Sequence, residues 1–301
     1  MAAAAIEQSI DALLRRHAVA GTRRPDLLVG LLGRGIQLSR TPAMHEREAA
    51  RLGLTCAYVL VDFDALQLAD SDVAVVLDVV AARNFNGVNV TYPFKQAIMP
   101  LLDVVADDAA AMGAVNTVVL GARRTGHNTD CWGYAQSFRE TMTGAPLGHV
   151  ALFGAGGAGS AVAYALIGLG AGRITIVDPV EGRGHALVER FAGVGNTVLA
   201  TASSAAEALA DADGVVNTTP VGMAKHPGAP FDLALLKPSH WVSDVIYFPQ
   251  ETELLKHARS LGCRTLPGIG MAIGQAARAF ELFTGRAADI VAMAEHFEAA
   301  A

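Results

Sequence analysis

Polar side chains gather in two short motifs of the first hundred residues. Ser39 and Thr41 stand two positions apart just before a proline, and Asn89 and Thr91 have the same spacing before a Tyr-Pro pair. Proline favours an extended backbone before it, and in an extended segment residues i and i+2 point the same way. Each motif can therefore aim two hydrogen-bonding groups at one spot of a small polar ligand. Taken alone, Thr41 also fits a plain helix N-cap.

Two charged residues, Lys95 and Asp130, each stand at the end of a short polar segment. Lys95 is expected on the first turn of a helix, where a cation opposes the helix dipole, so helix propensity does not explain it. Asp130 ends the stretch 126–130 and is expected at the end of a hairpin. Each alone also fits a bland role, a solvated lysine or a turn-forming aspartate. Position singles them out, because Lys95 ends the second polar motif and Asp130 ends the strand that leads to the expected second domain.

A glycine-rich loop follows the apolar segment 149–153 and opens a helix. It consists of Gly154, Ala155, Gly156, Gly157, Ala158 and Gly159. A strand, this loop and a helix are the context of the dinucleotide-binding fingerprint, in which glycines permit a tight turn and a close approach to a pyrophosphate. The free N–H groups of the helix start would bind the phosphates. Close helix packing without any ligand is the alternative interpretation.

Asp178 ends the next expected strand, 173–177, about twenty residues after the loop. A carboxylate at this place accepts hydrogen bonds from a ribose diol and repels a 2′-phosphate, so the pattern favours NAD over NADP. Arg183 follows five residues later and leaves NADP open. A turn formed by Asp178 before Pro179 is the plainer alternative, and an S-adenosylmethionine site has a similar glycine turn and acidic residue.

Short apolar runs alternate with helix-like stretches along most of the chain. Strands are expected at 27–32, 58–61, 87–91, 149–153, 173–177, 214–217 and 241–245, and helices at 42–53, 73–82, 160–170 and 272–284. The run 114–120 and the stretch up to Asn128, which residues 121–126 separate, are expected to form a hairpin. This alternation predicts an α/β fold with mostly parallel strands. The expected hairpin ends near Asp130 and a second series of strands and helices follows it, which predicts a domain boundary there.

Composition excludes several classes of protein. The 301 residues are enough for about two domains. A hydrophobic content of 52% with 17% charged residues excludes a disordered chain. The net charge of −6, without a basic run, argues against nucleic acid as a partner. The uncharged stretch 150–172 is long enough for a membrane span, but its glycine cluster predicts a buried strand–turn–helix instead.

The cysteines and the N-terminal segment indicate a reducing compartment. Cys56, Cys131 and Cys263 have neither zinc-site spacing nor a disulfide pattern, so no metal is expected and a cytoplasmic location is the simplest expectation. Residues 1–17 lack the leading basic region of a secretory signal and are expected to form an amphipathic helix.

Ordered motifs from about Val29 to Gly285 together resemble the shikimate/quinate dehydrogenase family. They are Gly30-Leu-Leu-Gly33 with Ser39-Arg-Thr41-Pro-Ala-Met-His45, Gly87-Val-Asn89-Val-Thr91-Tyr-Pro-Phe-Lys95, Gly113-Ala-Val-Asn116-Thr117, Gly126-His-Asn-Thr-Asp130, Asn217-Thr-Thr-Pro220, Asp244-Val-Ile-Tyr247 and Gly268-Ile-Gly-Met271-Ala-Ile-Gly-Gln275. The resemblance implies two α/β domains with the active site between them. It assigns residues 1–130 and 267–301 to a substrate-binding domain, to which the C-terminal helices return, and residues 131–266 to a Rossmann domain.

The resemblance also implies roles for single residues. Ser39 and Thr41, with Tyr247, would hold a substrate carboxylate, and Asn89, Thr91, Asn116 and Gln275 would hold ring hydroxyls. Lys95 and Asp130 would be the catalytic pair at the hydroxyl whose carbon loses a hydride. Thr218, Val245, Gly268 and Met271 would line the nicotinamide end of the cofactor. His45 belongs to the motif but is interpreted as structural.

Two departures from the biosynthetic members of this family favour NAD. Those enzymes usually have serine at the place of Thr41, and an Asn-Arg-Thr/Ser turn for NADP where this chain has Val177-Asp178-Pro179. The chain also lacks the family's common Asp before Gly268.

The implied activity is NAD-dependent oxidation of quinate or shikimate, as a monomer or a homodimer. The alternatives are an NADP-dependent biosynthetic shikimate dehydrogenase, an aminoshikimate-type relative, a methyltransferase and a non-catalytic dinucleotide-binding protein.

Overall fold

The computed structural model describes residues 3–17 and 24–299. The chain divides into two compact units, Met1–Thr129 with Ala276–Ala301, and Asp130–Gln275, called here the first and the second unit. Each unit has its own six-stranded sheet. No helix within the described residues is long and apolar enough to cross a membrane.

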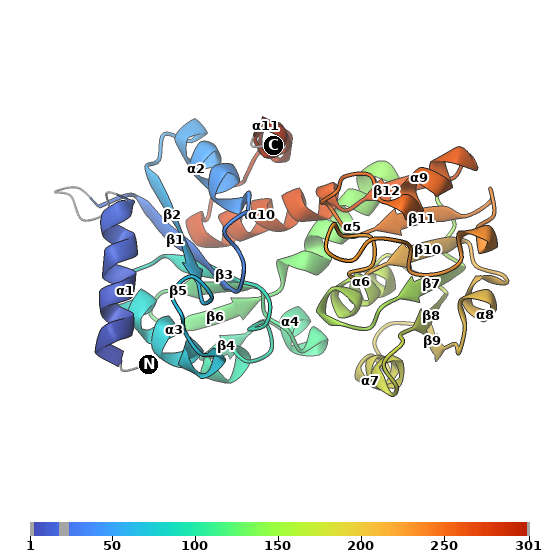
Figure 1. Cartoon of the computed structure of the whole chain (residues 1–301), viewed down its shortest axis with the longest axis horizontal. Helices are drawn as coiled ribbons and strands as arrows, with labels where there is room; N and C mark the ends of the chain where they lie inside the picture. Colours follow the sequence, from blue (N-terminus) through green and yellow to red (C-terminus); the bar gives the residue numbers. More distant parts are fainter. Residues whose placement is uncertain (1–2, 18–23, 300–301) are drawn as a thin grey trace. The chain divides into compact units, whose positions relative to one another are not determined.

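The sheet of the first unit has the order β2-β1-β3-β5-β6-β4 (Figure 1). Its strands are β1 (Leu27–Gly33), β2 (Cys56–Asp62), β3 (Gly87–Val90), β4 (Val104–Val105), β5 (Thr117–Leu120) and β6 (Arg124–His127). Strands β1, β2 and β3 are parallel, whereas β5 is antiparallel to β3 and to β6. Every residue of β1 is buried, which explains its uninterrupted apolar sequence.

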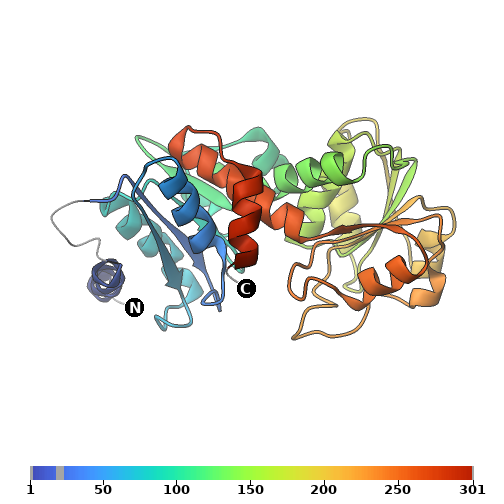
Figure 2. The ribbon, with the colours of Figure 1, turned by 90° about the horizontal axis from the view of Figure 1, so that it is seen from above.

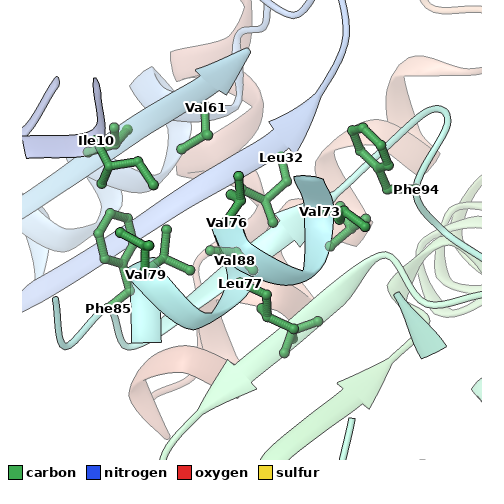
Figure 3. Close-up of a cluster of buried hydrophobic side chains, with 14 of the residues drawn as sticks. Ile10, Leu32, Val61, Val73, Val76, Leu77, Val79, Phe85, Val88 and Phe94 are labelled. Carbon is green, nitrogen blue, oxygen red and sulfur yellow. The ribbon is translucent and has the colours of Figure 1, made fainter. Parts of the chain in front are cut away.

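Helices cover both faces of this sheet. They are α1 (Ala3–Arg16), α2 (Thr41–Arg51), α3 (Val73–Ala82), α4 (Asp107–Met112), the C-terminal part of α10 (Ile269–Thr284) and α11 (Ile290–Ala299), with two 3-10 turns, η1 (Asp70–Asp72) and η2 (Met99–Leu101). On one face Ile10 of α1 packs in a cluster with Leu32, Val76 and Phe85 (Figure 3). On the other face Phe280 of α10 packs with the remaining side chains of β1.

The sheet of the second unit is entirely parallel and has the order β12-β11-β10-β7-β8-β9. Its strands are β7 (His149–Phe153), β8 (Arg173–Val177), β9 (Val198–Thr201), β10 (Gly214–Asn217), β11 (Trp241–Asp244) and β12 (Arg264–Pro267). The chain leaves β7 toward β8 on one side and reaches β10 on the other. In such doubly wound sheets a ligand binds at this switch point, outside the carboxyl ends of the strands.

Helices lie on both faces of the second sheet as well (Figure 2). They are α5 (Thr129–Thr141), α6 (Gly157–Gly168), α7 (Arg183–Arg190), α8 (Ala205–Leu209), α9 (Glu253–Ser260) and the first part of α10, with the 3-10 turn η3 (Leu233–Leu235). Leu209 of α8 and Leu254 of α9 pack with Val242 in one cluster. The α/β architecture expected from the sequence is confirmed, with an antiparallel strand, β5, only in the first unit.

Candidate active site

Ser39 and Thr41 lie at the start of α2. The Ser39 hydroxyl donates to Thr41 Oγ1 at 3.2 Å and accepts a hydrogen bond from the Thr41 N–H at 3.3 Å. The two hydroxyls are therefore adjacent. The extended backbone expected for this motif is wrong, however, because Arg40 has helical dihedral angles and Thr41 begins α2. The N-cap of α2 is Arg40, so the interpretation of Thr41 as the N-cap is wrong. Strand β1 ends at Gly33, so this motif follows a loop rather than the strand itself.

A buried carboxylate holds the loop between β1 and α2. Asp62, the last residue of β2, accepts hydrogen bonds from the N–H groups of Gly35 and Ile36 and from the Gln37 side chain, at 3.0–3.1 Å. Burial opposes ionisation of this carboxyl, but the hydrogen bonds outweigh it and lower the pKa of Asp62. The charge on Asp62 thus fixes the loop that leads to Ser39.

Asn89 and Thr91 come from the carboxyl end of β3. The Asn89 side chain is buried, accepts a hydrogen bond from the Tyr58 hydroxyl at 2.9 Å and donates to Thr117 Oγ1 at 3.0 Å. Thr91 follows the strand and packs closely over Gly33, where a Cβ atom would lie 2.4 Å from Thr91 Cγ2. The glycine of the first motif therefore makes room for the threonine of the second.

Asn116 continues the same hydrogen-bond network. Its Oδ1 accepts from the Thr129 N–H at 2.8 Å and from the Thr117 hydroxyl at 3.0 Å, and its Nδ2 donates to Thr129 Oγ1 at 3.1 Å. A continuous buried chain thus connects Tyr58, Asn89, Thr117, Asn116 and Thr129. Such a network fixes the orientation of both amides, because a rotated amide would leave buried polar groups unpaired.

Lys95 does not lie on a helix, and that expectation is wrong. Residues 92–98 form successive turns before η2. The Lys95 carbonyl accepts a hydrogen bond from the Val115 N–H at 2.8 Å, and the Met99 N–H donates to Gln96 instead. A helix would have required the bond from Met99 to Lys95. The contact with Val115 fixes the Lys95 backbone one residue from Asn116.

Asp130 lies in the first turn of α5, and the expectation of a loop position is wrong. The Asn116 side chain accepts a hydrogen bond from the Thr129 N–H. This N–H is one of the donors at the start of a helix that have no partner inside the helix. An aspartate in the first turn is favoured by the helix dipole. The capping group comes from thirteen residues earlier, so the local sequence around Asp130 does not reveal the helix.

The glycine-rich loop of the second unit connects β7 to α6. Gly154 has a φ of 101° and Gly159 packs against it, since a Cβ on Gly159 would lie 2.1 Å from the Gly154 carbonyl oxygen. Gly156 and Gly157 are exposed, and a Cβ on either would meet nothing within 4 Å. Two glycines therefore serve the fold. The other two leave open space at the start of α6, which fits a pyrophosphate.

Asp178 follows β8 and directly contacts the glycine-rich loop. Its Oδ2 accepts a hydrogen bond from the Ala155 N–H at 2.7 Å, and its Oδ1 accepts one from the Val180 N–H at 2.9 Å. Asp178 thus forms a turn with Val180 and also lies beside the glycine-rich loop, so both interpretations of this residue apply. The Arg183 guanidinium lies 3.8 Å from Asp178 Oδ1 and is half exposed. Each carboxylate oxygen has a second lone pair for a ribose hydroxyl.

Several residues predicted for the cofactor surround the ends of β7, β10 and β11. The Thr218 hydroxyl is 2.8 Å from the carbonyl oxygens of both Phe153 and Gly154, so it lies against the glycine-rich loop. Val245, Gly268 and Met271 line one narrow crevice.

The loop that contains Val245 is fixed by Asp244. Asp244 is fully buried and binds the Ile246 N–H and the side chains of Asn217 and Thr252. Burial raises the pKa of Asp244, although these hydrogen bonds act in the opposite direction.

Tyr247 and Gln275 are the two remaining predicted substrate residues. Tyr247 is 47% exposed and follows β11. Gln275 lies on α10, where its side chain donates to the Ala272 carbonyl at 3.1 Å. Both belong to the second unit, as does Asp130, whereas the other predicted substrate residues belong to the first, namely Ser39, Thr41, Asn89, Thr91, Lys95 and Asn116.

Sequence reasoning missed the residues that orient the predicted ones. Tyr58 was recognised only as part of an apolar strand, and Asp62 and Arg40 were not singled out. Thr117 and Thr129 belong to two of the quoted motifs, but no role was assigned to either. No group of three or more His, Cys, Asp or Glu side chains that could hold a metal ion occurs in the described ranges 3–17 and 24–299.

Comparisons with known proteins match the same regions. The family model for the shikimate dehydrogenase substrate binding domain matches residues 31–118, and that for the shikimate 5′-dehydrogenase C-terminal domain matches residues 268–296. The first range contains Ser39, Asn89, Lys95 and Asn116, and the second contains Gln275.

Individual relatives align over nearly the whole chain. A shikimate dehydrogenase (NADP(+)) of Streptomyces avermitilis is 48% identical over 88% of this chain and 93% of its own length. A quinate/shikimate dehydrogenase (NAD(+)) of Corynebacterium glutamicum is 46% identical over 90% of this chain and 98% of its own. The solved structure of quinate dehydrogenase from Corynebacterium glutamicum in complex with NAD superposes with a TM-score of 0.86, at 46% identity over 91% and 99% of the two chains.

Proposed function

We propose that this chain, which belongs to the shikimate/quinate dehydrogenase family, transfers a hydride between a ring secondary hydroxyl of quinate or shikimate and NAD. It is an oxidoreductase, and the products of oxidation are 3-dehydroquinate and 3-dehydroshikimate. The observation that supports the substrate class most is the buried network that fixes the amides of Asn89 and Asn116. Two oriented amides, in the same unit as the adjacent hydroxyls of Ser39 and Thr41, suit a ligand with several hydroxyls and a carboxylate.

In this proposal each polar residue has a defined task. The hydroxyls of Ser39 and Thr41, with that of Tyr247, bind the substrate carboxylate. The ring hydroxyls are bound by Asn89, Thr91, Asn116 and Gln275. This set of directional contacts holds the reacting C–H bond in one orientation, which is the main contribution that a protein makes to hydride transfer.

Lys95 and Asp130 act at the hydroxyl that is oxidised. Oxidation breaks the O–H bond and the C–H bond of the same ring position; the proton goes to the Lys95 amine, and the hydride leaves with both electrons of the C–H bond. In ketone reduction Lys95 returns the proton to the oxygen as a general acid. Asp130 stabilises the lysine ammonium that forms, because a carboxylate beside an amine favours its charged form. Oxidation releases one proton overall, so rising pH favours the ketone.

The glycine-rich loop and its neighbours fit a bound dinucleotide. The cofactor, when bound, supplies the hydride acceptor of the oxidation. The open space at Gly156 and Gly157 suits the pyrophosphate, and Asp178 suits the adenine-side ribose. Arg183 lies beside Asp178, and Thr218, Val245, Gly268 and Met271 suit the nicotinamide end.

Replacement of Lys95 tests the assignment. We expect Lys95→Ala to lower kcat for oxidation by about 100-fold or more while KM changes little, because general acid–base catalysis is worth ~10²–10⁴-fold. Lys95→Arg is the matched control: it keeps the positive charge but cannot give up its proton. Equal loss in both variants supports proton transfer. A rise in KM alone in Lys95→Ala, or normal kcat in Lys95→Arg, would instead make Lys95 a substrate anchor.

A second candidate function is NADP-dependent reduction of 3-dehydroshikimate. The Streptomyces avermitilis relative is named for NADP. In this chain Arg183 is half exposed at 3.8 Å from Asp178, where a guanidinium would meet a 2′-phosphate. The buried carboxylate of Asp178 at the same place opposes that phosphate, so NAD is the proposed cofactor.

A further inference from the structure

The side chain between the two predicted carboxylate-binding hydroxyls is tied to the C-terminal helix. Arg40 separates Ser39 from Thr41 in the sequence, and its guanidinium carbon lies 5.0 Å from the centre of the Phe297 ring on α11. Arg40 Nη1 also donates a hydrogen bond to the Phe297 carbonyl at 3.3 Å. The contact joins residues 257 positions apart, and both belong to the first unit.

Helix α11 is attached to α2 at a second point as well. The buried carboxylate of Glu48, on the second turn of α2, accepts a hydrogen bond from the Asp289 N–H at 2.8 Å and is paired with Arg51. Asp289 in turn accepts hydrogen bonds from the Val291 and Ala292 N–H groups at the start of α11. The start of α11 thus lies near Glu48.

The end of α11 lies near Arg40, so the two helices run side by side in opposite directions (Figure 2). The cation of Arg40 meets the last turn of α11, where the helix dipole favours a positive charge. The phenyl ring of Phe297, which is 2% exposed, gives the flat guanidinium a buried surface to lie on. The contact with Phe297 directs the Arg40 side chain toward α11, while the Arg40 backbone connects Ser39 to Thr41.

We propose that α11 is a positioning element for the substrate, and that Arg40 is the residue through which it acts. By holding Arg40, the helix fixes the first turn of α2 and keeps the hydroxyls of Ser39 and Thr41 together in the arrangement that binds a carboxylate. This inference rests on the proposed function, because it assumes that these hydroxyls bind the acid group of the substrate.

The test compares Arg40→Ala, Phe297→Ala and the double variant with the wild type. We expect KM for quinate and shikimate to rise by about tenfold in Arg40→Ala, which removes both contacts with Phe297. Phe297→Ala removes the ring contact but keeps the backbone carbonyl, so KM should rise less in this variant, and kcat and KM for NAD should be unchanged in both. In the double variant KM should rise no further than in Arg40→Ala, since Arg40→Ala already removes every contact that Phe297→Ala removes. Val291→Ala is the control: Val291 lies on α11 and is 71% exposed, so its replacement should leave every constant unchanged.

Thermal unfolding of each variant separates positioning from general destabilisation. A lower Tm with unchanged KM would overturn the inference, since α11 would then serve stability alone. A raised KM in Arg40→Ala with no rise at all in Phe297→Ala would also overturn it, because the ring on α11 would then play no part in holding Arg40. Wild-type protein that oxidises neither acid would overturn the proposed function itself, whereas active wild type with unchanged variants would overturn only this inference.

Discussion

Single residues decide how this protein responds to pH and to its cofactor. His45 on α2 is completely buried against the rings of Tyr58, Phe280 and Phe283. Within the described residues neither ring nitrogen has a hydrogen-bond partner. Burial therefore lowers the pKa of His45 to about 3, and the side chain is neutral in the folded protein.

The neutral state of His45 predicts an acid-sensitive stability. An unfolded histidine has a pKa of about 6.5, so the unfolded chain binds a proton below that pH while the folded chain does not until about pH 3. The contribution is complete above pH 6.5 and is lost progressively as the pH falls toward 3. At pH 5 the loss is about 2 kcal/mol.

Denaturant unfolding at pH 7.5 and pH 5 checks this prediction. We expect the free energy of unfolding of wild-type protein to fall by about 2 kcal/mol more than that of His45→Leu between these values. An equal fall in both proteins would show that His45 does not titrate in this window.

Asp178 governs the choice of cofactor at the same scale. We expect Asp178→Asn to keep the hydrogen bond that forms the turn with Val180 but to lose the one from Ala155, because an amide has a single accepting oxygen. The substitution also removes the charge that repels a 2′-phosphate. The ratio of kcat/KM for NAD to that for NADP should fall by about tenfold. An unchanged ratio in steady-state kinetics would reduce Asp178 to a turn residue.

The predicted site residues and their supporting residues differ in what the sequence reveals. Ser39, Thr41, Asn89 and Thr91 were found because their spacing and the following prolines are local features. The partners that fix them are remote: Tyr58 bonds to Asn89 across 31 positions, for example. A tyrosine in an apolar strand gives no local sign of such a bond, so the network could not be predicted.

At the scale of elements, the glycine-rich loop combines two tasks that substitutions can separate. We expect Gly159→Ala to lower Tm strongly, because its Cβ would collide with the Gly154 carbonyl. Gly156 has a φ of −77° and free space around it, so Gly156→Ala should fold normally. It should nevertheless weaken NAD binding by about tenfold or more, because the methyl group occupies the space proposed for the pyrophosphate.

Calorimetric titration with NAD and thermal unfolding check this pair together. Normal NAD affinity in Gly156→Ala, with an unchanged Tm, would place the cofactor elsewhere on the second unit.

Most elements follow from local patterns, and the exceptions have identifiable causes. The strands β7, β8 and β10 and the helix α3 have the predicted bounds, because they are short apolar runs with clear flanking signals. Helix α5 was missed because a side chain from another segment caps it. The helix expected at Lys95 does not form because its carbonyl bonds to Val115 instead. Long-range hydrogen bonds thus overrule local propensity at both charged residues of the proposed catalytic pair.

At the scale of the whole molecule, the first unit is built from two separate parts of the chain. Residues Ala276–Ala301 belong to the same unit as Met1–Thr129. No local pattern connects segments about 150 positions apart, and this return was implied only by the resemblance of ordered motifs. The domain limits at residues 130 and 267 remain predictions.

The central claim is that this chain oxidises quinate or shikimate with NAD. Initial rates of nicotinamide reduction, measured with each acid and with NAD and NADP, test it most directly. We predict turnover with NAD on at least one acid and much slower turnover with NADP. Turnover only with NADP and shikimate would contradict the cofactor assignment, and no turnover in all four combinations, with NAD still bound, would contradict the substrate assignment.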